Sequence, residues 1–236
     1  MTDQPGRVPD LSKFECAIRL TPQGRALHQA ILTAFAHTGQ APSRADLSRL
    51  AHTSGLDIDI PAALHELAAS DLVVVDQHGE LRAAYPFSPA STPHRVHITD
   101  GPTVSAMCAI DALGMSAMLG RPVTITSSEP DTGQPVVVQV DGEAATWRPS
   151  SAVVFAGATG DCCAPSADRT CGHINFFTTP EAAHAWAGRH PDLTGMLLDQ
   201  DQALTCAVAE FGGLLGDPEG ATTELGHNQT QTRPEP

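Results

Sequence analysis

Two side chains that can act on a soft metal or an electrophilic carbon stand three positions apart in the segment 107–114. Cys108 offers a thiol and Asp111 offers a carboxyl that can donate a proton. The surrounding run is apolar and compatible with a helix, on which side chains three positions apart share one face. A cysteine in an apolar helix is most often a core residue, but an aspartate on the same face is costly to bury without a partner or a role. The pair therefore predicts a reactive site, with a packed core cysteine as the alternative.

A second thiol precedes a strand-like run in the segment 171–177, which reads Cys-Gly-His-Ile-Asn-Phe-Phe. Cys171 and His173 stand two positions apart, so they share one face if the segment is extended, and they form a candidate metal-ligand pair. A structural histidine is the more common explanation of such a residue. The chain has no Cys-x-x-Cys pair, so a structural zinc site is not expected.

Taken together, Cys-x-x-Asp followed by Cys-x-His-x-x-Phe-Phe resembles the organomercurial lyases, also called alkylmercury lyases. Three further segments are similar to that family: 120–123 (Gly-Arg-Pro-Val), 132–136 (Thr-Gly-Gln-Pro-Val) and 180–186. The resemblance implies that Cys108, Asp111 and Cys171 form the reactive trio and bind the mercury of substrate and product. It further implies cleavage of a carbon–mercury bond to give a hydrocarbon and Hg(II). No organic cofactor is expected, and a small thiol or a mercuric reductase would accept the Hg(II).

The sequence departs from the family pattern near both parts of the trio. Ser105 stands where the family often has an aromatic residue, and Met107 precedes the first cysteine, so the substrate pocket is expected to be lined differently. The polar loop 157–170 is longer and contains Cys162 and Cys163. Adjacent cysteines rarely bridge each other, because the geometry is strained. An accessory thiol role, a redox pair and inert residues remain open for them.

Composition limits the class of protein. Thirteen basic against 27 acidic residues give a net charge of −14, which opposes attraction to nucleic acids or anionic membranes. The N-terminus lacks a secretion signal and no apolar run has membrane-spanning length, so a cytoplasmic location with reduced thiols is expected. Lys13 is the chain's one lysine, while Cys16 and Cys206 lie in apolar runs and are expected in the core.

The first part of the chain predicts a winged helix: helices over 22–38, 44–54 and 59–70, then a hairpin over 72–85. Such a module suggests DNA binding through its third helix. Here that helix has acidic residues and no Lys or Arg, so it is expected to repel phosphate. A thiol-based, soft-metal-sensing transcriptional regulator is the alternative function, and the acidic third helix argues against it. A lyase-like paralogue with another substrate is a further alternative.

The whole pattern predicts an α+β fold. An N-terminal winged-helix-like domain (1–85) is expected to lead through a linker (86–100) to a catalytic domain (101–216) with a mainly antiparallel sheet and flanking helices, followed by a disordered tail (217–236). The helix that carries Cys108 is expected to begin at residues 101–103 and to end near Leu119, before Gly120. Strands are expected at 95–98, 123–126, 136–140, 152–155 and 174–177.

Overall fold

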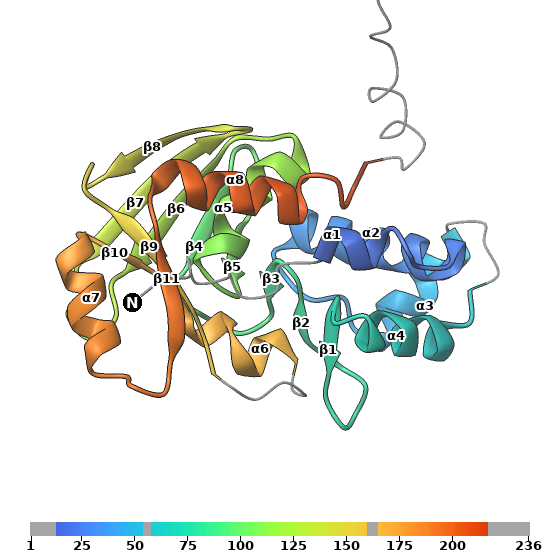
Figure 1. The fold of residues 1–236 in the computed structure, drawn as a ribbon. Coiled ribbons are helices and arrows are strands. Elements are labelled where there is room, and N and C mark those ends of the chain that lie inside the picture. Colours follow the sequence, from blue (N-terminus) through green and yellow to red (C-terminus); the bar gives the residue numbers. More distant parts are fainter. Residues whose placement is uncertain (1–12, 54–57, 160–164, 217–236) are drawn as a thin grey trace, which may run out of the picture.

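A computed structural model describes residues 13–53, 58–159 and 165–216 (Figure 1). Its helices are α1 (Lys13–Ala17), α2 (Pro22–Thr38), α3 (Arg44–Thr53), α4 (Ile60–Ala69), α5 (Ala109–Leu119), α6 (Ser166–Arg169), the 3₁₀ helix η1 (Cys171–His173), α7 (Pro180–Gly188) and α8 (Gln200–Phe211). Its strands are β1 (Val73–Val75), β2 (Leu81–Ala84), β3 (Phe87–Ser88), β4 (Arg95–Ile98), β5 (Thr103–Ala106), β6 (Val123–Ser128), β7 (Pro135–Asp141), β8 (Ala144–Arg148), β9 (Val153–Ala158), β10 (Ile174–Phe177) and β11 (Thr194–Leu198). The expected mixture of helices and antiparallel sheet is confirmed.

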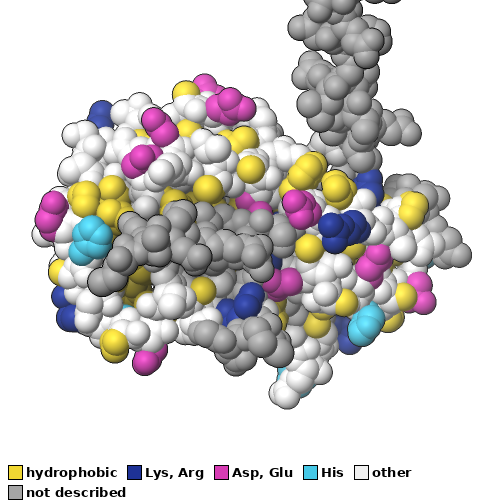
Figure 2. Space-filling view, viewed as in Figure 1, with side chains coloured by type: hydrophobic (Ala, Val, Ile, Leu, Met, Phe, Trp, Pro, Cys, Tyr) yellow, Lys and Arg dark blue, Asp and Glu magenta, His cyan; other side chains and the backbone are white. Residues whose placement is uncertain are grey.

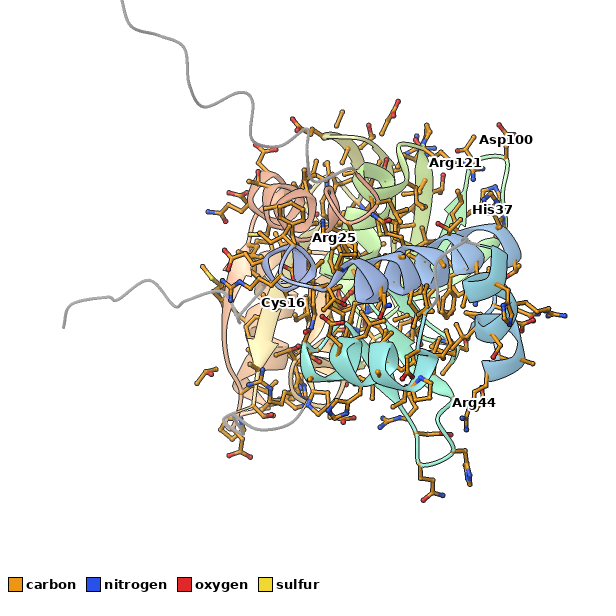
Figure 3. The ribbon with its side chains drawn as sticks, turned by 90° about the vertical axis from the view of Figure 1, so that its right-hand side faces the viewer. Cys16, Arg25, His37, Arg44, Asp100 and Arg121 are labelled. Atoms are coloured by element: carbon orange, nitrogen blue, oxygen red, sulfur yellow. The ribbon has the colours of Figure 1, made fainter. Side chains whose placement is uncertain are left out.

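The N-terminal helices begin and end at the residues that their sequence suggests. Thr21 caps α2 and proline follows it, while Gly39 ends that helix in the left-handed conformation, with φ of 75°. Asp59 caps α4 in the same way as Thr21 caps α2. Figure 3 shows α2 running alongside α4, with Arg25 and His37 near the two ends of α2. The segment 13–17, which contains Lys13 and Cys16, is the helix α1.

The larger sheet is antiparallel at every pairing, in the order β1-β2-β3-β5-β4-β6-β7-β8. Residues 86–100, expected to be a linker, contain β3 and β4 of this sheet. Because β3 pairs with β2 on one side and β5 on the other, the N-terminal hairpin and the strands of the expected catalytic domain form one sheet. The division of the chain into domains stays a prediction, and the expected tail lies outside the described residues.

A smaller sheet has β9 at its centre, paired antiparallel with β10 and β11. Helix α7 covers it through a separate apolar cluster that includes Phe155, Phe177 and Trp186. The ring centres of Phe155 and Phe177 lie 5.7 and 5.5 Å from that of Trp186. Trp186 is therefore a packing residue, and this cluster fixes the strand that follows Cys171.

Helix α5 is the centre of the main core, because it contacts strands of both sheets on one side and α8 on the other (Figure 1). Residues 109–116 of this helix are all buried. Its expected start at residues 101–103 is wrong: Thr103–Ala106 form β5, and the helix begins only after Cys108. Thr103 and Val104 are β-branched and pair with β4, so the strand is favoured over an extra helical turn.

Within the described residues, no helix combines the length and apolar character that crossing a membrane would require.

Candidate active site

Cys108 lies at the junction between β5 and α5, where it caps the helix. Its backbone is extended, with φ of −153°, and its sulfur accepts a hydrogen bond from the backbone N–H of Asp111 at 3.4 Å. Partial positive charge at a helix N-terminus favours a negatively charged group at this position. The thiol thus lies at the N-terminus of α5, before the first helical turn.

Asp111 occupies the first turn of α5, and its carboxyl turns back toward the cap. The Cys108 thiol donates a hydrogen bond to Asp111 Oδ2 at 2.5 Å. The second carboxyl oxygen, Oδ1, is buried and has no hydrogen-bond partner among the described residues. An unpartnered buried oxygen is costly, so it is a candidate to accept or donate a proton during a reaction.

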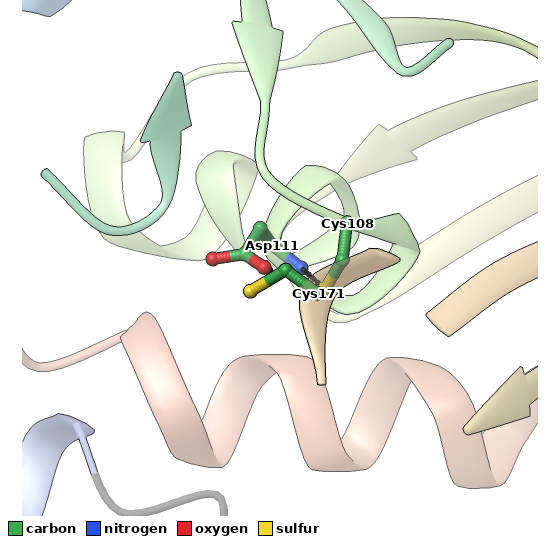
Figure 4. Close-up of side chains that lie close together, drawn as sticks. All are labelled: Cys108, Asp111 and Cys171. Atoms are coloured by element: carbon green, nitrogen blue, oxygen red, sulfur yellow. Dashed lines mark hydrogen bonds between the residues drawn. The ribbon is translucent and has the colours of Figure 1, made fainter. Parts of the chain in front are cut away.

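Cys171 belongs to a later part of the chain and lies beside Cys108 and Asp111 (Figure 4). It begins η1, which connects α6 to β10, whereas the sequence placed it directly before a strand. The Cys108 sulfur, an Asp111 oxygen and the Cys171 sulfur all lie within 4.8 Å of one another. The structure therefore brings together the three residues that the sequence singled out.

Burial shifts the pKa values of Asp111 and Cys108. It raises the pKa of Asp111 from 3.8 to about 7, against the hydrogen bond from Cys108 and the charge of Lys13, which lower it. Burial also raises the pKa of the Cys108 thiol well above its usual range, as do its hydrogen bond with Cys171 and the charge of Asp111. Near neutral pH the Cys108–Asp111 pair consequently holds at least one proton, shared between sulfur and oxygen.

The trio is closed off from solvent. Cys108, Asp111 and Cys171 are only 2, 3 and 5% exposed. A dry site strengthens electrostatic interactions and favours soft, weakly hydrated ligands over water. A substrate can therefore reach the sulfurs only when neighbouring groups move.

The other residues that the sequence singled out have different surroundings. His173 is in η1, not in a strand, and it is not one of the clustered ligand groups. Ser105 accepts a hydrogen bond from Arg95 at 2.9 Å, and Met107 packs against the main core.

Of the other cysteines that the structure describes, neither Cys16 nor Cys206 belongs to the cluster. Cys16 and Cys206 are partly buried against the same core, where the sequence placed them. Cys162 and Cys163 lie outside the described residues.

Sequence reasoning missed two polar groups beside the trio. Lys13 and Glu210 both affect the pKa of Asp111, the first lowering it and the second raising it. The sequence offers one signal for Lys13, because it is the chain's one lysine. Glu210 is 3% exposed and follows no motif that would have found it.

A buried polar chain also reaches the turn that holds Cys171. The His94 ring nitrogen Nδ1 lies 2.8 Å from Ser127 Oγ, and burial lowers the pKa of this histidine to about 4. Asn175, which also hydrogen-bonds to His94, donates to the carbonyl of Gly172 at 3.1 Å. These contacts fix the backbone next to Cys171.

Comparisons with known proteins agree with this arrangement. A family model described as "Alkylmercury lyase" matches residues 87–212. The alkylmercury lyase of Streptomyces lividans is 34% identical over 130 residues, which are 54% of this chain and 59% of that protein. The alkylmercury lyase of Staphylococcus epidermidis is 35% identical over 121 residues, 51% of this chain and 55% of that protein.

A solved structure described as the mercury-bound form of MerB2 superposes with a TM-score of 0.69 and 27% identity, covering 87% of this chain and 98% of that one. The chain thus spans between half and three fifths of the length of the curated relatives that it matches.

Proposed function

This chain belongs to the alkylmercury lyase family, and we propose that it cleaves the carbon–mercury bond of organomercury compounds to release a hydrocarbon and Hg(II). One observation carries the proposal: two thiols and a carboxyl with a pKa near 7 are buried within 4.8 Å of one another. Thiolates are the preferred protein ligands of a soft cation, and a carboxyl poised near neutrality can both take up and give back a proton.

The first proposed step attaches mercury to Cys108, because that thiol already donates to Asp111 Oδ2. The sulfur–mercury bond forms, the thiol proton moves to the Asp111 carboxylate, and the anion that accompanied the organomercury cation leaves. Cys171 then adds its sulfur as a second ligand and its proton goes to solvent. Two thiolates donate electron density to the metal and so make the bound carbon more basic.

The second step moves the proton from Asp111 to that carbon. The electron pair of the carbon–mercury bond becomes the new carbon–hydrogen bond, the carboxylate is restored, and Hg(II) remains between the two sulfurs. No oxidation state changes, so this scheme has no role for an organic cofactor. A small thiol or a mercuric reductase would then take the Hg(II) by exchange of sulfur ligands. The cytoplasmic location of this reaction stays a prediction from the sequence.

The proposal gives the N-terminal region a covering role. Three helices, α2 to α4, and the β1–β2 hairpin have the order of a winged helix, but α4 contains no Lys or Arg. Figure 2 shows basic side chains lying apart from one another on the visible described surface, with no continuous basic patch. These features support a structural module over a DNA reader, and so disfavour the metal-sensing regulator.

The test is anaerobic turnover of phenylmercury with excess small thiol, with benzene release as the readout. We expect release by the native chain and a loss of at least about 100-fold in Cys108→Ser, Cys171→Ser and Asp111→Asn, since each removes a reacting group. Cys206→Ser is the matched control, because that cysteine is outside the trio. Mercury binding without benzene release by the native chain would instead favour a paralogue with another substrate.

A further inference from the structure

Polar side chains from four distant parts of the chain meet beside the trio, in a group that we call the Lys13 cluster: Lys13, Asp71, Tyr85 and Ser166. The Lys13 ammonium donates to Asp71 Oδ2 and to the Asp71 carbonyl, each at 2.6 Å, and to Ser166 Oγ at 3.1 Å. It also lies 3.9 Å from the centre of the Tyr85 ring. Lys13 and Ser166 are each 7% exposed and Tyr85 is 1% exposed, whereas the Asp71 side chain is 35% exposed, so the ammonium is buried while its carboxylate partner reaches the surface.

The cluster holds the first residues of α6. The backbone N–H of Ser166 lies 3.3 Å from both carboxyl oxygens of Asp71. The backbone N–H of Ala167 donates to the Tyr85 hydroxyl at 2.6 Å. Helix α6 therefore takes its position from α1, from the turn after α4 and from the end of β2.

Helix α6 in turn leads to Cys171 through a short bonded path. Thr170 donates to the Ser166 carbonyl through both its backbone N–H, at 2.9 Å, and its hydroxyl, at 3.0 Å. The backbone N–H of His173 donates to the Thr170 carbonyl at 2.8 Å. Cys171 lies between these anchored residues, so a shift of Ser166 moves the thiol.

We propose that Lys13 is a positioning residue for Cys171: through Asp71 and Ser166 it fixes α6 and so holds the Cys171 thiol within reach of Cys108 and Asp111. The positioning stands on the contacts above, and its effect on turnover rests on the proposed lyase function. An apolar side chain would be cheaper to bury than an ammonium, but it could not bind three oxygens in fixed directions. The ion pair between the buried Lys13 ammonium and the partly exposed Asp71 carboxylate thus defines geometry more than it adds stability.

The position of the cluster beside the trio is supported electrostatically. The ammonium of Lys13 is one of the groups that oppose the burial-driven rise in the pKa of Asp111. Burial raises the pKa of Tyr85, and the charges of Cys171 and Asp71 raise it further. Lys13 is therefore close to the Asp111 carboxyl, and Tyr85 is close to the Cys171 thiol.

The test compares the rates at which iodoacetamide alkylates Cys171 and Cys108 in the native chain and in Lys13→Met, resolved by mass spectrometry. We expect Cys171 alkylation to rise at least about tenfold while that of Cys108 changes less than about threefold, because only the α6 side of the site is released. Asp71→Asn breaks the same ion pair from its other partner and is expected to give the same pattern. The double variant is expected to show a Cys171 alkylation rate no higher than that of either single variant.

Arg82→Met is the matched control, because Arg82 also binds α6 through Asp168 at 3.1 Å but both side chains are about half exposed. It should leave both alkylation rates unchanged. Equal acceleration at Cys108 and Cys171, or no acceleration at Cys171 in folded Lys13→Met and Asp71→Asn, would overturn the proposal. The readout does not need lyase activity, so it separates a failure of positioning from a failure of the proposed function. If the lyase function holds, kcat also falls about tenfold in Lys13→Met.

Discussion

The carboxyl of Asp111 is buried against a thiol, and that environment raises its pKa to about 7. This raised pKa affects both the reaction and the stability of the chain. Above this pKa the carboxylate can take the proton that Cys108 loses when its sulfur binds mercury. The same burial costs stability, because an ionised carboxyl in an apolar site loses its hydration.

We predict a pH dependence of mercury attachment that follows Asp111. Below about pH 7 the carboxyl is already protonated and cannot accept the thiol proton, so kcat/KM should fall by about tenfold per pH unit. The later cleavage step uses a proton held inside the site, so its single-turnover rate should vary little between about pH 6 and 8. Stopped-flow measurement across this range checks both, and a kcat/KM that rises on acidification would contradict the assignment.

The same shift in the pKa of Asp111 should make the stability of the folded chain depend on pH. The pKa is 3.8 in the reference state and about 7 in the fold, so the folded chain binds the extra proton between these values and loses stability as pH rises through them. Asp111→Asn is expected to raise the free energy of unfolding at pH 8 by about 2 kcal/mol or more. The gain should vanish near pH 4, and urea unfolding at both pH values measures it. Equal stability of the two chains at pH 8 would be inconsistent with a destabilised carboxylate.

Among the elements, α5 and α8 pack so closely that a glycine is required between them. A Cβ on Gly114 would lie 2.5 Å from a ring carbon of Phe211 and 2.8 Å from the Ala207 carbonyl oxygen. The second neighbour is backbone and cannot rotate away. This contact sets the distance of α5 from α8, and α5 carries Asp111.

Gly114→Ala should therefore destabilise the chain by about 1–3 kcal/mol through overpacking, although alanine is the better helix former by about 1 kcal/mol. Gly188→Ala in α7 is the matched control, because an added Cβ there meets no atom within 4 Å. That change should be neutral or stabilising. Denaturant midpoints give the comparison, and similar midpoints for the two variants would refute the packing argument.

The elements were predictable where local signals are strong. Thr21 and Gly39 bound α2 as their capping preferences suggest, and β4, β6, β7 and β10 fall where apolar alternation or β-branched residues predicted strands. The start of α5 was misplaced and β8 was not foreseen, because pairing with neighbouring strands decides both.

The candidate site was predicted in its members but not in its geometry. Cys108, Asp111 and Cys171 were identified from residue types and a family resemblance. Cys108 as a cap, η1 and the Lys13 cluster were not, since each depends on contacts between residues far apart in the sequence.

For the whole molecule, charge decides between the two classes of function considered. The net charge is −14, and the third helix of the winged-helix-like region carries no Lys or Arg. Phosphate contacts from basic side chains supply most non-specific affinity for DNA. A regulator of this charge would need a local basic surface to compensate, and none is seen on the described face in Figure 2.

We therefore predict no DNA complex at about 10 µM protein and about 50 mM salt, conditions that favour electrostatic binding. A mobility-shift assay with mixed genomic fragments, with and without Hg(II), checks this. The N-terminal region should instead affect turnover through the Lys13 cluster. A salt-sensitive mobility shift that appears or disappears on adding Hg(II) would instead support the metal-sensing transcriptional regulator.

The most direct measurement of the central claim is a single turnover of phenylmercury in D₂O, with the protein in excess and no added thiol. If the buried trio transfers an exchangeable proton to carbon, the benzene released carries one deuterium and one Hg(II) per turnover stays bound to the chain. Cys171→Ser should bind the substrate and release far less benzene. Benzene without deuterium, or equal release by the native chain and Cys171→Ser, would contradict proton transfer at a site of two thiols and one carboxyl.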